Sequence, residues 1–313
     1  MSARIRIGTR ASPLARAQTE EVVRRLAAAE PTLRAEGALA VEIIHTTGDR
    51  MLQGPLSAIG GKGLFTKEIE QALKAGRIDI AVHSMKDMPT RLPDGLAIGA
   101  VLPRADPRDA LIAADADAGS RGLGGLAEGA AVGTASLRRG ALVRHARPDL
   151  RVVAFRGNVQ TRLRKLADGE ADATLLALAG LDRLGLAHRA HAVLDSDIML
   201  PAACQGIIGI ECRADDTVTR ELLRAIDDRD SADAAAAERA LLDGLDGSCR
   251  TPIAALAVPE REAMSLRAIL VRPDGTDLLA TERSGSRADA AAMGSDAARE
   301  LRARATPAHF VGV

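Results

Sequence analysis

The residue whose setting suggests chemistry most strongly is Asp87. It lies in the segment His83-Ser-Met-Lys86-Asp87-Met-Pro89, directly after an apolar run over residues 78–82 that predicts a strand. Cationic residues recur at other predicted strand ends, and nearby cations keep a carboxyl group ionised. An ionised aspartate in such a place can stabilise a developing cation or accept hydrogen bonds from N–H donors. The alternative interpretation is an exposed lysine–aspartate loop that does no chemistry.

Cations and hydroxyls gather where predicted strands give way to helices. The segments are Gly8-Thr-Arg10-Ala-Ser12-Pro, Val132-Gly-Thr134-Ala-Ser136-Leu-Arg138-Arg139, Phe155-Arg156-Gly-Asn158 with Thr161-Arg162 after it, and Gly60-Gly-Lys62-Gly-Leu-Phe65. Positive side chains oppose the dipole at a helix N-terminus, and an anionic partner would remove that conflict. Capping serines and solvated surface charges explain each segment taken alone. Their repetition favours a polyanionic ligand.

The three cysteines, Cys204, Cys212 and Cys249, are an odd number without metal-ligand spacing. This favours reduced thiols over a secreted disulfide framework. Cys249 differs from the other two because it lies in the glycine-containing segment Gly247-Ser-Cys-Arg250-Thr-Pro, beside a cation. An accessible thiol with thiolate character is what covalent chemistry requires. His188 and His191 lack further ligands nearby, so no metal site is predicted.

Composition argues against several classes of protein. Lys plus Arg and Asp plus Glu both total 42, so the formal net charge is zero and no overall field attracts nucleic acid or an anionic membrane. Without Trp or Tyr, and with three Phe, the chain lacks stacking platforms for single-stranded nucleic acid. The glycines around Lys62 do not have P-loop spacing. A charged N-terminus and the absence of 18 consecutive apolar residues predict a cytoplasmic protein without membrane association.

The 313 residues correspond to roughly two domains by length, and their pattern predicts an α/β fold. Strands are expected at 5–8, 40–44, 78–82 and 96–101, with helices after Ser12 and at 65–75. A second series is expected at 110–113, 130–133, 151–155 and 173–178. Beyond residue 216, helices at 219–227 and 232–242, strands at 253–258 and 265–271, and a last helix to residue 304 predict a small α+β domain. Ligands are expected at the carboxyl ends of the strands, in a cleft between the two α/β units.

Taken together, these segments resemble those of the porphobilinogen deaminase family, also called hydroxymethylbilane synthases, over nearly the whole chain. The resemblance rests on eight motifs in a specific order: Ile7-Gly-Thr-Arg-Ala-Ser-Pro-Leu-Ala, Gly60-Gly-Lys-Gly-Leu-Phe-Thr-Lys-Glu, Ala81-Val-His-Ser-Met-Lys-Asp-Met-Pro, Asp106-Pro-Arg-Asp-Ala, Val132-Gly-Thr-Ala-Ser-Leu-Arg-Arg, Arg156-Gly-Asn-Val-Gln-Thr-Arg-Leu, Ala179-Gly-Leu-Asp-Arg-Leu-Gly and Pro201-Ala-Ala-Cys-Gln-Gly. It implies two domains like those of periplasmic binding proteins, at 1–103 with 205–218 and at 104–204, and an α+β domain at 219–313.

The resemblance also implies a reaction. Four porphobilinogen molecules condense head to tail with loss of ammonia on a covalently attached dipyrromethane primer, and hydrolysis then releases the linear tetrapyrrole hydroxymethylbilane. By this likeness, the Cys249 thiol holds the single dipyrromethane cofactor through a thioether, and Asp87 is the catalytic carboxylate. The enzyme is then a transferase of porphyrin and heme biosynthesis, expected to be a monomer that hands its product to the next enzyme of the pathway.

The remaining implied roles are contacts with the cofactor and the substrate. Most are contacts with carboxylates, because each pyrrole carries an acetate and a propionate and arginine forks suit carboxylates. Asp87 would hold pyrrole nitrogens, and Phe65 would lie against a pyrrole ring. The likeness gives cofactor binding to Lys86, Asp87, Thr134, Ser136, Arg138, Arg139 and Arg156. It gives substrate binding to Arg10, Ser12, Lys62, Phe65, Arg162 and Arg183. Ala135 departs from the family, which commonly has a serine there.

A non-catalytic protein is the main alternative. Two α/β lobes with cationic loops would also suit a two-lobed binding protein that closes around a carboxylate ligand. The third domain and its thiol argue against this alternative.

Overall fold

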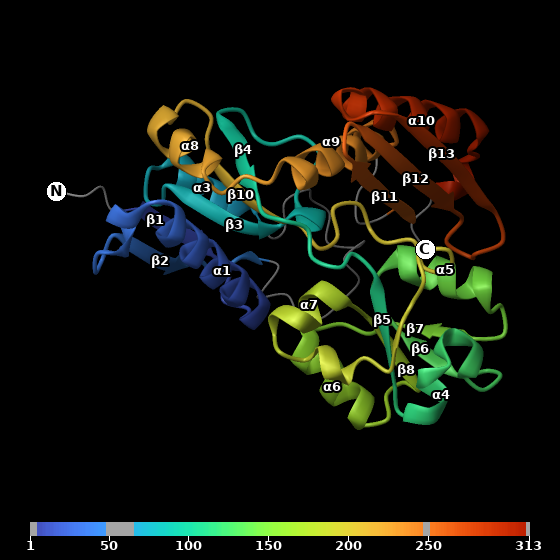
Figure 1. Ribbon diagram of the computed structural model, residues 1–313. Coiled ribbons are helices and arrows are strands. Elements are labelled where there is room, and N and C mark those ends of the chain that lie inside the picture. Colours follow the sequence, from blue (N-terminus) through green and yellow to red (C-terminus); the bar gives the residue numbers. More distant parts are fainter. Residues whose placement is uncertain (1–4, 48–65, 247–250, 311–313) are drawn as a thin grey trace. The chain divides into compact units, whose positions relative to one another are not determined.

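The computed structural model describes residues 5–47, 66–246 and 251–310. Its contacts divide the chain into two compact units (Figure 1). Unit 1 consists of Met1–Ala105 and Ile207–Ala232, and unit 2 consists of Asp106–Gly206 and Asp233–Val313. The chain therefore leaves unit 1, builds part of unit 2, and returns to unit 1 before it ends in unit 2.

Unit 1 is built on a five-stranded sheet of order β2-β1-β3-β10-β4. Strand β1 is parallel to β2 and β3, whereas β10 is antiparallel to β3 and β4. The strands are β1 (Ile5–Thr9), β2 (Leu39–Ile43), β3 (Ile80–Ser84), β4 (Leu96–Val101) and β10 (Ile208–Arg213), and the helical segments are α1 (Pro13–Ala29), η1 (Pro31–Arg34), α3 (Lys67–Lys74), η2 (Met85–Asp87) and α8 (Thr217–Arg224).

Helices cover both faces of this sheet. Val22 and Leu26 of α1 lie four residues apart on one helical face and pack with Ile80. Ile69 and Leu73 of α3 pack with Ala81 instead. Since successive residues of a strand point to opposite faces, α1 and α3 lie on opposite sides of β3.

Unit 2 repeats this plan with a sheet of order β7-β6-β8-β5-β9. Strand β6 is parallel to β7 and β8, and β5 is antiparallel to β8 and β9, so β5 holds the place that β10 has in unit 1. The strands are β5 (Asp109–Ala113), β6 (Ala131–Gly133), β7 (Arg151–Val153), β8 (Ala173–Ala177) and β9 (Ala192–Val193), and the helical segments are α4 (Ala116–Ser120), η3 (Gly122–Gly125), α5 (Leu137–Ala146), α6 (Val159–Ala167), α7 (Leu178–Arg183) and η4 (Ala187–Arg189).

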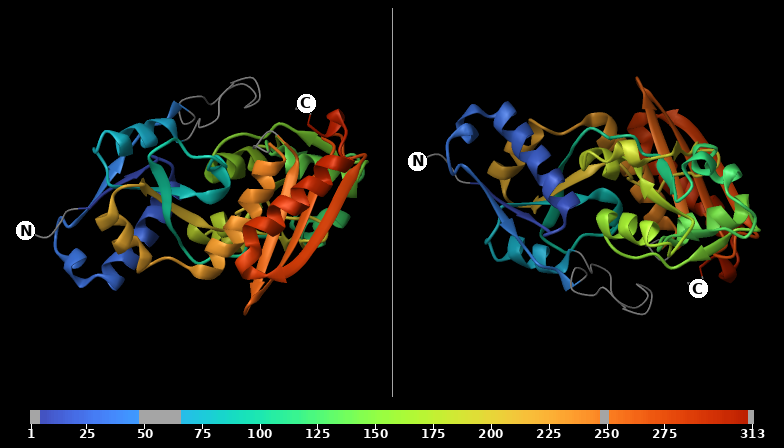
Figure 2. Two further views of the ribbon diagram at one scale, coloured as in Figure 1. Left: turned by 90° about the horizontal axis from the view of Figure 1, so that it is seen from above. Right: turned by 90° about the horizontal axis from the view of Figure 1, so that it is seen from below.

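The C-terminal part of unit 2 is an antiparallel sheet of order β11-β12-β13 with its own apolar core. Helices α9 and α10 lie along this sheet (Figure 2). The elements are α9 (Arg229–Gly244), β11 (Ile253–Glu260), β12 (Ala263–Val271), β13 (Leu278–Ser286), η5 (Arg287–Asp289), α10 (Ala290–Arg304) and η6 (Pro307–His309). The fold class, α/β units with a small α+β portion, is confirmed, while the limits of three domains stay a prediction.

Several strands differ from the sequence prediction, and β3 and β13 show the reasons most clearly. The strand predicted at 78–82 runs from Ile80 to Ser84, because the Ile78 amide still bonds to the Ala72 carbonyl in the turn after α3. Strand β13 was not predicted, since most of its side chains are exposed or half-buried and it carries no apolar alternation. The turn before it, with Gly275 at φ 79°, was the available signal.

Candidate active site

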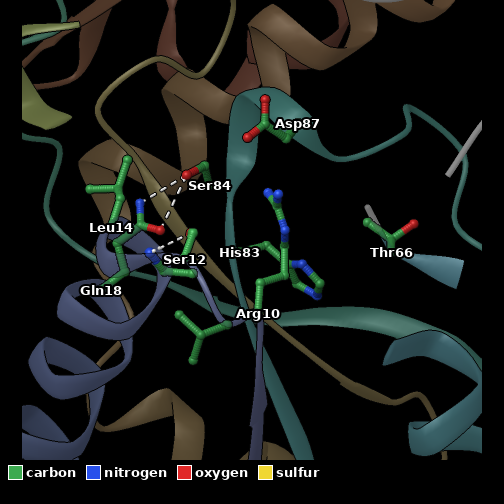
Figure 3. A pocket seen from close by; sticks show the side chains of 10 residues that line it. Arg10, Ser12, Leu14, Gln18, Thr66, His83, Ser84 and Asp87 are labelled. Atoms are coloured by element: carbon green, nitrogen blue, oxygen red, sulfur yellow. Dashed lines mark hydrogen bonds between the residues drawn. The ribbon is translucent and has the colours of Figure 1, made fainter. Parts of the chain in front are cut away.

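Several residues singled out from the sequence meet at a recess in unit 1 (Figure 3). The recess lies where β1 and β3 end and α1 begins, as the strand-end argument predicts. Its lining is Arg10, Ser12, Leu14, Ala15, Gln18, Thr66, Val82, His83, Ser84 and Asp87. The structure thus brings together Arg10, Ser12 and Asp87.

The wall of the recess on the α1 side is held by side-chain hydrogen bonds. Ser12 is the N-cap of α1, and its hydroxyl accepts from the Ala15 amide at 3.3 Å. Gln18 donates from Nε2 to Oγ of Ser84 at 2.9 Å and so joins α1 to the end of β3. Gln18 was not identified from the sequence, although a polar residue within the buried stripe of α1 was an available signal.

Asp87 lies on the short η2 turn and is exposed, whereas its neighbour Lys86 is half-buried. In Figure 3, the Arg10 side chain extends from beside His83 toward Asp87. The turn is anchored by buried Met85, which packs onto β10 at Gly209, where a Cβ atom would lie 2.2 Å from the Met85 sulfur. A fixed turn therefore presents an accessible carboxylate beside a cation.

One residue of this lining, buried His83, is paired with buried Glu211, and neither was chosen from the sequence. His83 is bonded through Nε2 to Oε2 of Glu211 at 3.1 Å. The two residues are 128 positions apart, so no local pattern connects them.

The paired arginines of unit 2 are buried around one carboxylate. Arg138 and Arg139 each donate from Nη2 to a carboxylate oxygen of Asp109 at 2.7 Å. From Nη1, Arg138 donates to the Leu200 carbonyl and Arg139 donates to the Leu175 carbonyl. Burial alone would raise the pKa of Asp109, but the two guanidinium charges hold it well below its ordinary value. The sequence led us to expect an anionic ligand beside these arginines, and the anion that both of them contact is Asp109 of the protein itself.

Two further observations complete this cluster. Gln205 donates from Nε2 to Oδ1 of Asp109 at 2.8 Å. Ser136 caps α5 and accepts from the Arg139 amide at 3.4 Å, and the buried Thr134 hydroxyl accepts from the Ser136 amide at 3.1 Å. The motif that contains Asp109 was recognised from the sequence, but its role as partner of both arginines was not.

Positive charge that Asp109 does not neutralise remains around Arg162. Burial lowers the pKa of Arg162 to about 10, and the charges of Arg139 and Arg156 lower it in the same direction. Arg162 donates from Nε to the Gly157 carbonyl at 2.9 Å, which is a neutral partner. Local cationic excess of this kind suits a bound carboxylate. Arg183, at the end of α7, donates to the Gly206 carbonyl at 2.8 Å.

Three of the predicted site residues, Cys249, Lys62 and Phe65, lie outside the described residues. The other two cysteines, Cys204 and Cys212, are buried. Within the described ranges, no group of three potential metal ligands occurs. The helices in those ranges include none with the length and apolarity that crossing a membrane requires.

Comparison with known proteins gives strong matches. The family model described as porphobilinogen deaminase, dipyromethane cofactor binding domain, matches residues 5–221, and the model of the porphobilinogen deaminase C-terminal domain matches residues 232–303. A porphobilinogen deaminase of Paracoccus denitrificans (strain Pd 1222) is 57% identical over 306 residues, which cover 98% of this chain and 96% of that protein. A chloroplastic porphobilinogen deaminase of Oryza sativa subsp. japonica is 52% identical over 309 residues, covering 98% and 85%.

Among solved structures, an ancestral cationic amino acid solute binding protein is similar with a TM-score of 0.43 and 17% identity. The match covers 72% of this chain and 88% of that chain.

Proposed function

The chain belongs to the porphobilinogen deaminase family, and from this premise we propose which of its residues carry the reaction. Its activity is that of hydroxymethylbilane synthase, a transferase that condenses four porphobilinogen molecules with loss of ammonia and releases a linear tetrapyrrole. The reaction uses a dipyrromethane cofactor. The non-catalytic binding protein considered from the sequence is not favoured.

Asp87 is the catalytic carboxylate in this proposal. The observation that carries it is the placement of one exposed carboxylate on a fixed turn in a recess that Arg10 and Ser12 also line. As ammonia leaves porphobilinogen, positive charge develops on the pyrrole, and an ionised carboxylate at this place stabilises that charge. Arg10 and Ser12 bind a substrate carboxylate at the same recess.

The cations of unit 2 hold cofactor and substrate carboxylates. A dipyrromethane fits the residues present, because Arg162 lies among cationic neighbours that lower its pKa and a carboxylate would offset their repulsion. Asp109 fixes Arg138 and Arg139 in place, so they meet a ligand as a preorganised pair. The cofactor contacts are assigned to Lys86, Asp87, Thr134, Ser136, Arg138, Arg139 and Arg156, and the substrate contacts to Arg10, Ser12, Lys62, Phe65, Arg162 and Arg183.

Cys249 is the attachment point of the cofactor. When bound, the dipyrromethane supplies the free pyrrole α-carbon from which the chain grows. A thioether is stable to the repeated additions, and the family assignment together with the Gly247-Ser-Cys sequence supports this role.

The finer organisation follows from the same family. We assign three domains, at 1–103 with 205–218, at 104–204 and at 219–313. We also assign the chain to the cytoplasm as a monomer that hands hydroxymethylbilane to the next tetrapyrrole enzyme.

The test of cofactor attachment is the intact mass of the native protein. The wild type should exceed its sequence mass by one thioether-linked dipyrromethane, and Cys249→Ser should match its sequence mass. Cys212→Ser is the matched control, because that thiol is buried in a strand, and it should keep the added mass. A wild type at the bare sequence mass, or a modified Cys249→Ser, would contradict the assignment.

A further inference from the structure

Two neutral polar side chains in the wall of the Asp87 recess have no role in the proposed function. They are Gln18 of α1 and Ser84 at the end of β3. Gln18 is 3% exposed, whereas Ser84 is half-buried. Figure 3 shows both near Ser12, on the opposite side of the recess from Thr66. Ser84 is thus the member of the pair that a ligand in the recess can reach.

The Ser84 hydroxyl is held by Gln18 and not by the backbone. Ser84 is the N-cap of the η2 turn, where serine often accepts from a backbone amide, but its side chain makes no such bond. Instead, Gln18 Nε2 donates to Oγ of Ser84 at 2.9 Å, and Oγ donates to Gln18 Oε1 at a longer 3.2 Å. The Gln18 amide therefore fixes the Ser84 oxygen, while the Ser84 proton can turn to a stronger acceptor.

A second hydroxyl of the recess is in a similar state. The oxygen of Ser12 accepts from the Ala15 amide, which leaves its proton for another acceptor. Arg10 lines the same recess and brings a charged donor group. An ionised carboxylate offers about four lone-pair positions, so a guanidinium fork leaves room for hydroxyl donors. Since hydrogen bonds to a charged acceptor are the stronger ones, a bound carboxylate draws the Ser84 proton away from Gln18 Oε1.

We propose that Ser84 is a further substrate-binding residue that donates a hydrogen bond to the acetate or propionate carboxylate of porphobilinogen, and that Gln18 is its positioning residue. A site built to hydrogen-bond a substrate group rejects analogues that lack this group. Ser84 thereby contributes to the recognition of the acidic arms of the pyrrole, beside the charge of Arg10. This inference rests on the proposed binding of substrate at the Asp87 recess.

Binding of an unreactive pyrrole tests the contact. The probe carries the acetate and propionate of porphobilinogen but a hydrogen in place of the aminomethyl group, so it cannot lose ammonia. Titration calorimetry of the cofactor-loaded enzyme should give a Kd that rises about 10-fold in Ser84→Ala. Ser84→Thr keeps the hydroxyl and should bind nearly as the wild type does. Thr19→Val, which removes a buried hydroxyl bonded to the Ala15 carbonyl of α1, is the matched control and should leave Kd unchanged.

Two further probes distinguish a direct contact from a general disturbance of the recess. Each has a methyl group in place of one of the two acidic arms. The probe without the arm that Ser84 contacts should bind Ser84→Ala and the wild type equally. The other probe should keep the difference of about 10-fold, because its contact with the hydroxyl is still present in the wild type.

A variant of Gln18 tests the positioning role. Gln18→Met removes the amide at similar side-chain length, so it should raise the Kd of the complete probe in the wild type but have no further effect in Ser84→Ala. An unchanged Kd in Ser84→Ala, or an equal loss of affinity for all three probes, overturns the inference. If Asp87→Asn is inactive while Ser84→Ala binds every probe as the wild type does, the proposed function stands and the Ser84 contact fails.

Discussion

The sheets of the two units have corresponding strand orders, but each contains a buried carboxylate with different hydrogen-bond partners. Asp109 on β5 and Glu211 on β10 occupy the corresponding antiparallel strands, and both are 0% exposed. Asp109 accepts from two arginines and Gln205. Glu211 is bonded by His83, while its Oε1 has no hydrogen-bond partner in the described part of the chain.

The two carboxylates therefore differ in the charge of their partners. Guanidinium groups keep their proton under all ordinary conditions, so the Asp109 cluster is a permanent charge with fixed geometry. Glu211 instead contacts an imidazole, which does not carry a permanent charge. The fixed cations of unit 2 are suited to holding carboxylates, while Asp87, the carboxylate proposed to perform the chemistry, lies in unit 1.

The largest expected effect is that of Asp87→Asn, which tests whether unit 1 is the chemical half. Turnover of porphobilinogen should fall by about 100- to 10,000-fold. The substitution removes the negative charge that stabilises the positive charge on the pyrrole as ammonia leaves. The melting temperature should change little, since Asp87 is exposed. Near-normal porphobilinogen consumption by this variant would remove Asp87 from its catalytic role.

A smaller but substantial effect is expected on stability when the two buried carboxylates are neutralised. Asp109→Asn leaves two buried guanidinium groups without their anion and should lower the free energy of unfolding by about 3 to 5 kcal/mol. Glu211→Gln removes a charge with a single donor and should cost about 1 kcal/mol. Urea denaturation of both variants measures the difference, and equal losses would contradict the contrast between the units.

The smallest effect is a pH dependence of opposite sign in the two units. Burial, reinforced by the charge of Glu211, raises the pKa of Glu70. A raised pKa means that Glu70 favours folding below its ordinary pKa and loses that contribution as pH rises through the raised value. Glu70→Gln should therefore melt higher than the wild type at pH 8, and the gain should shrink toward pH 4.

Asp109 should show the reverse behaviour. Because its pKa is lowered in the folded state, its contribution is complete above the ordinary aspartate pKa and is lost only as pH falls below that value. The deficit of Asp109→Asn should thus stay constant from pH 8 to pH 5. Melting curves at several pH values check both variants, and a Glu70→Gln gain independent of pH would refute the first expectation.

Local features of the fold were predictable from the sequence because they depend on neighbouring residues. Ser12 and Ser136 cap helices, and strand ends place Arg10 and Asp87 at one recess. Pro31 and Gly76 marked the ends of α1 and α3.

Partnerships across the sheet were not predictable in this way. Asp109 lies 29 and 30 residues from its arginines, and His83 lies 128 residues from Glu211. A buried carboxylate in a strand has the same local sequence whether it meets an arginine, a histidine or nothing. Only the strand order decides its partner, and that order depends on β5 and β10 inserting as antiparallel strands.

The late position of β10 has a consequence for biosynthesis. On the ribosome, all five strands of the β7-β6-β8-β5-β9 sheet, which lie between residues 109 and 193, are synthesised before Ile208 of β10. Until then, β3 and β4 of unit 1 lack the strand that joins them. The nascent chain must therefore carry an incomplete unit 1 sheet until Arg213, the last residue of β10, has been made, which is after every strand of the β7-β6-β8-β5-β9 sheet has been synthesised.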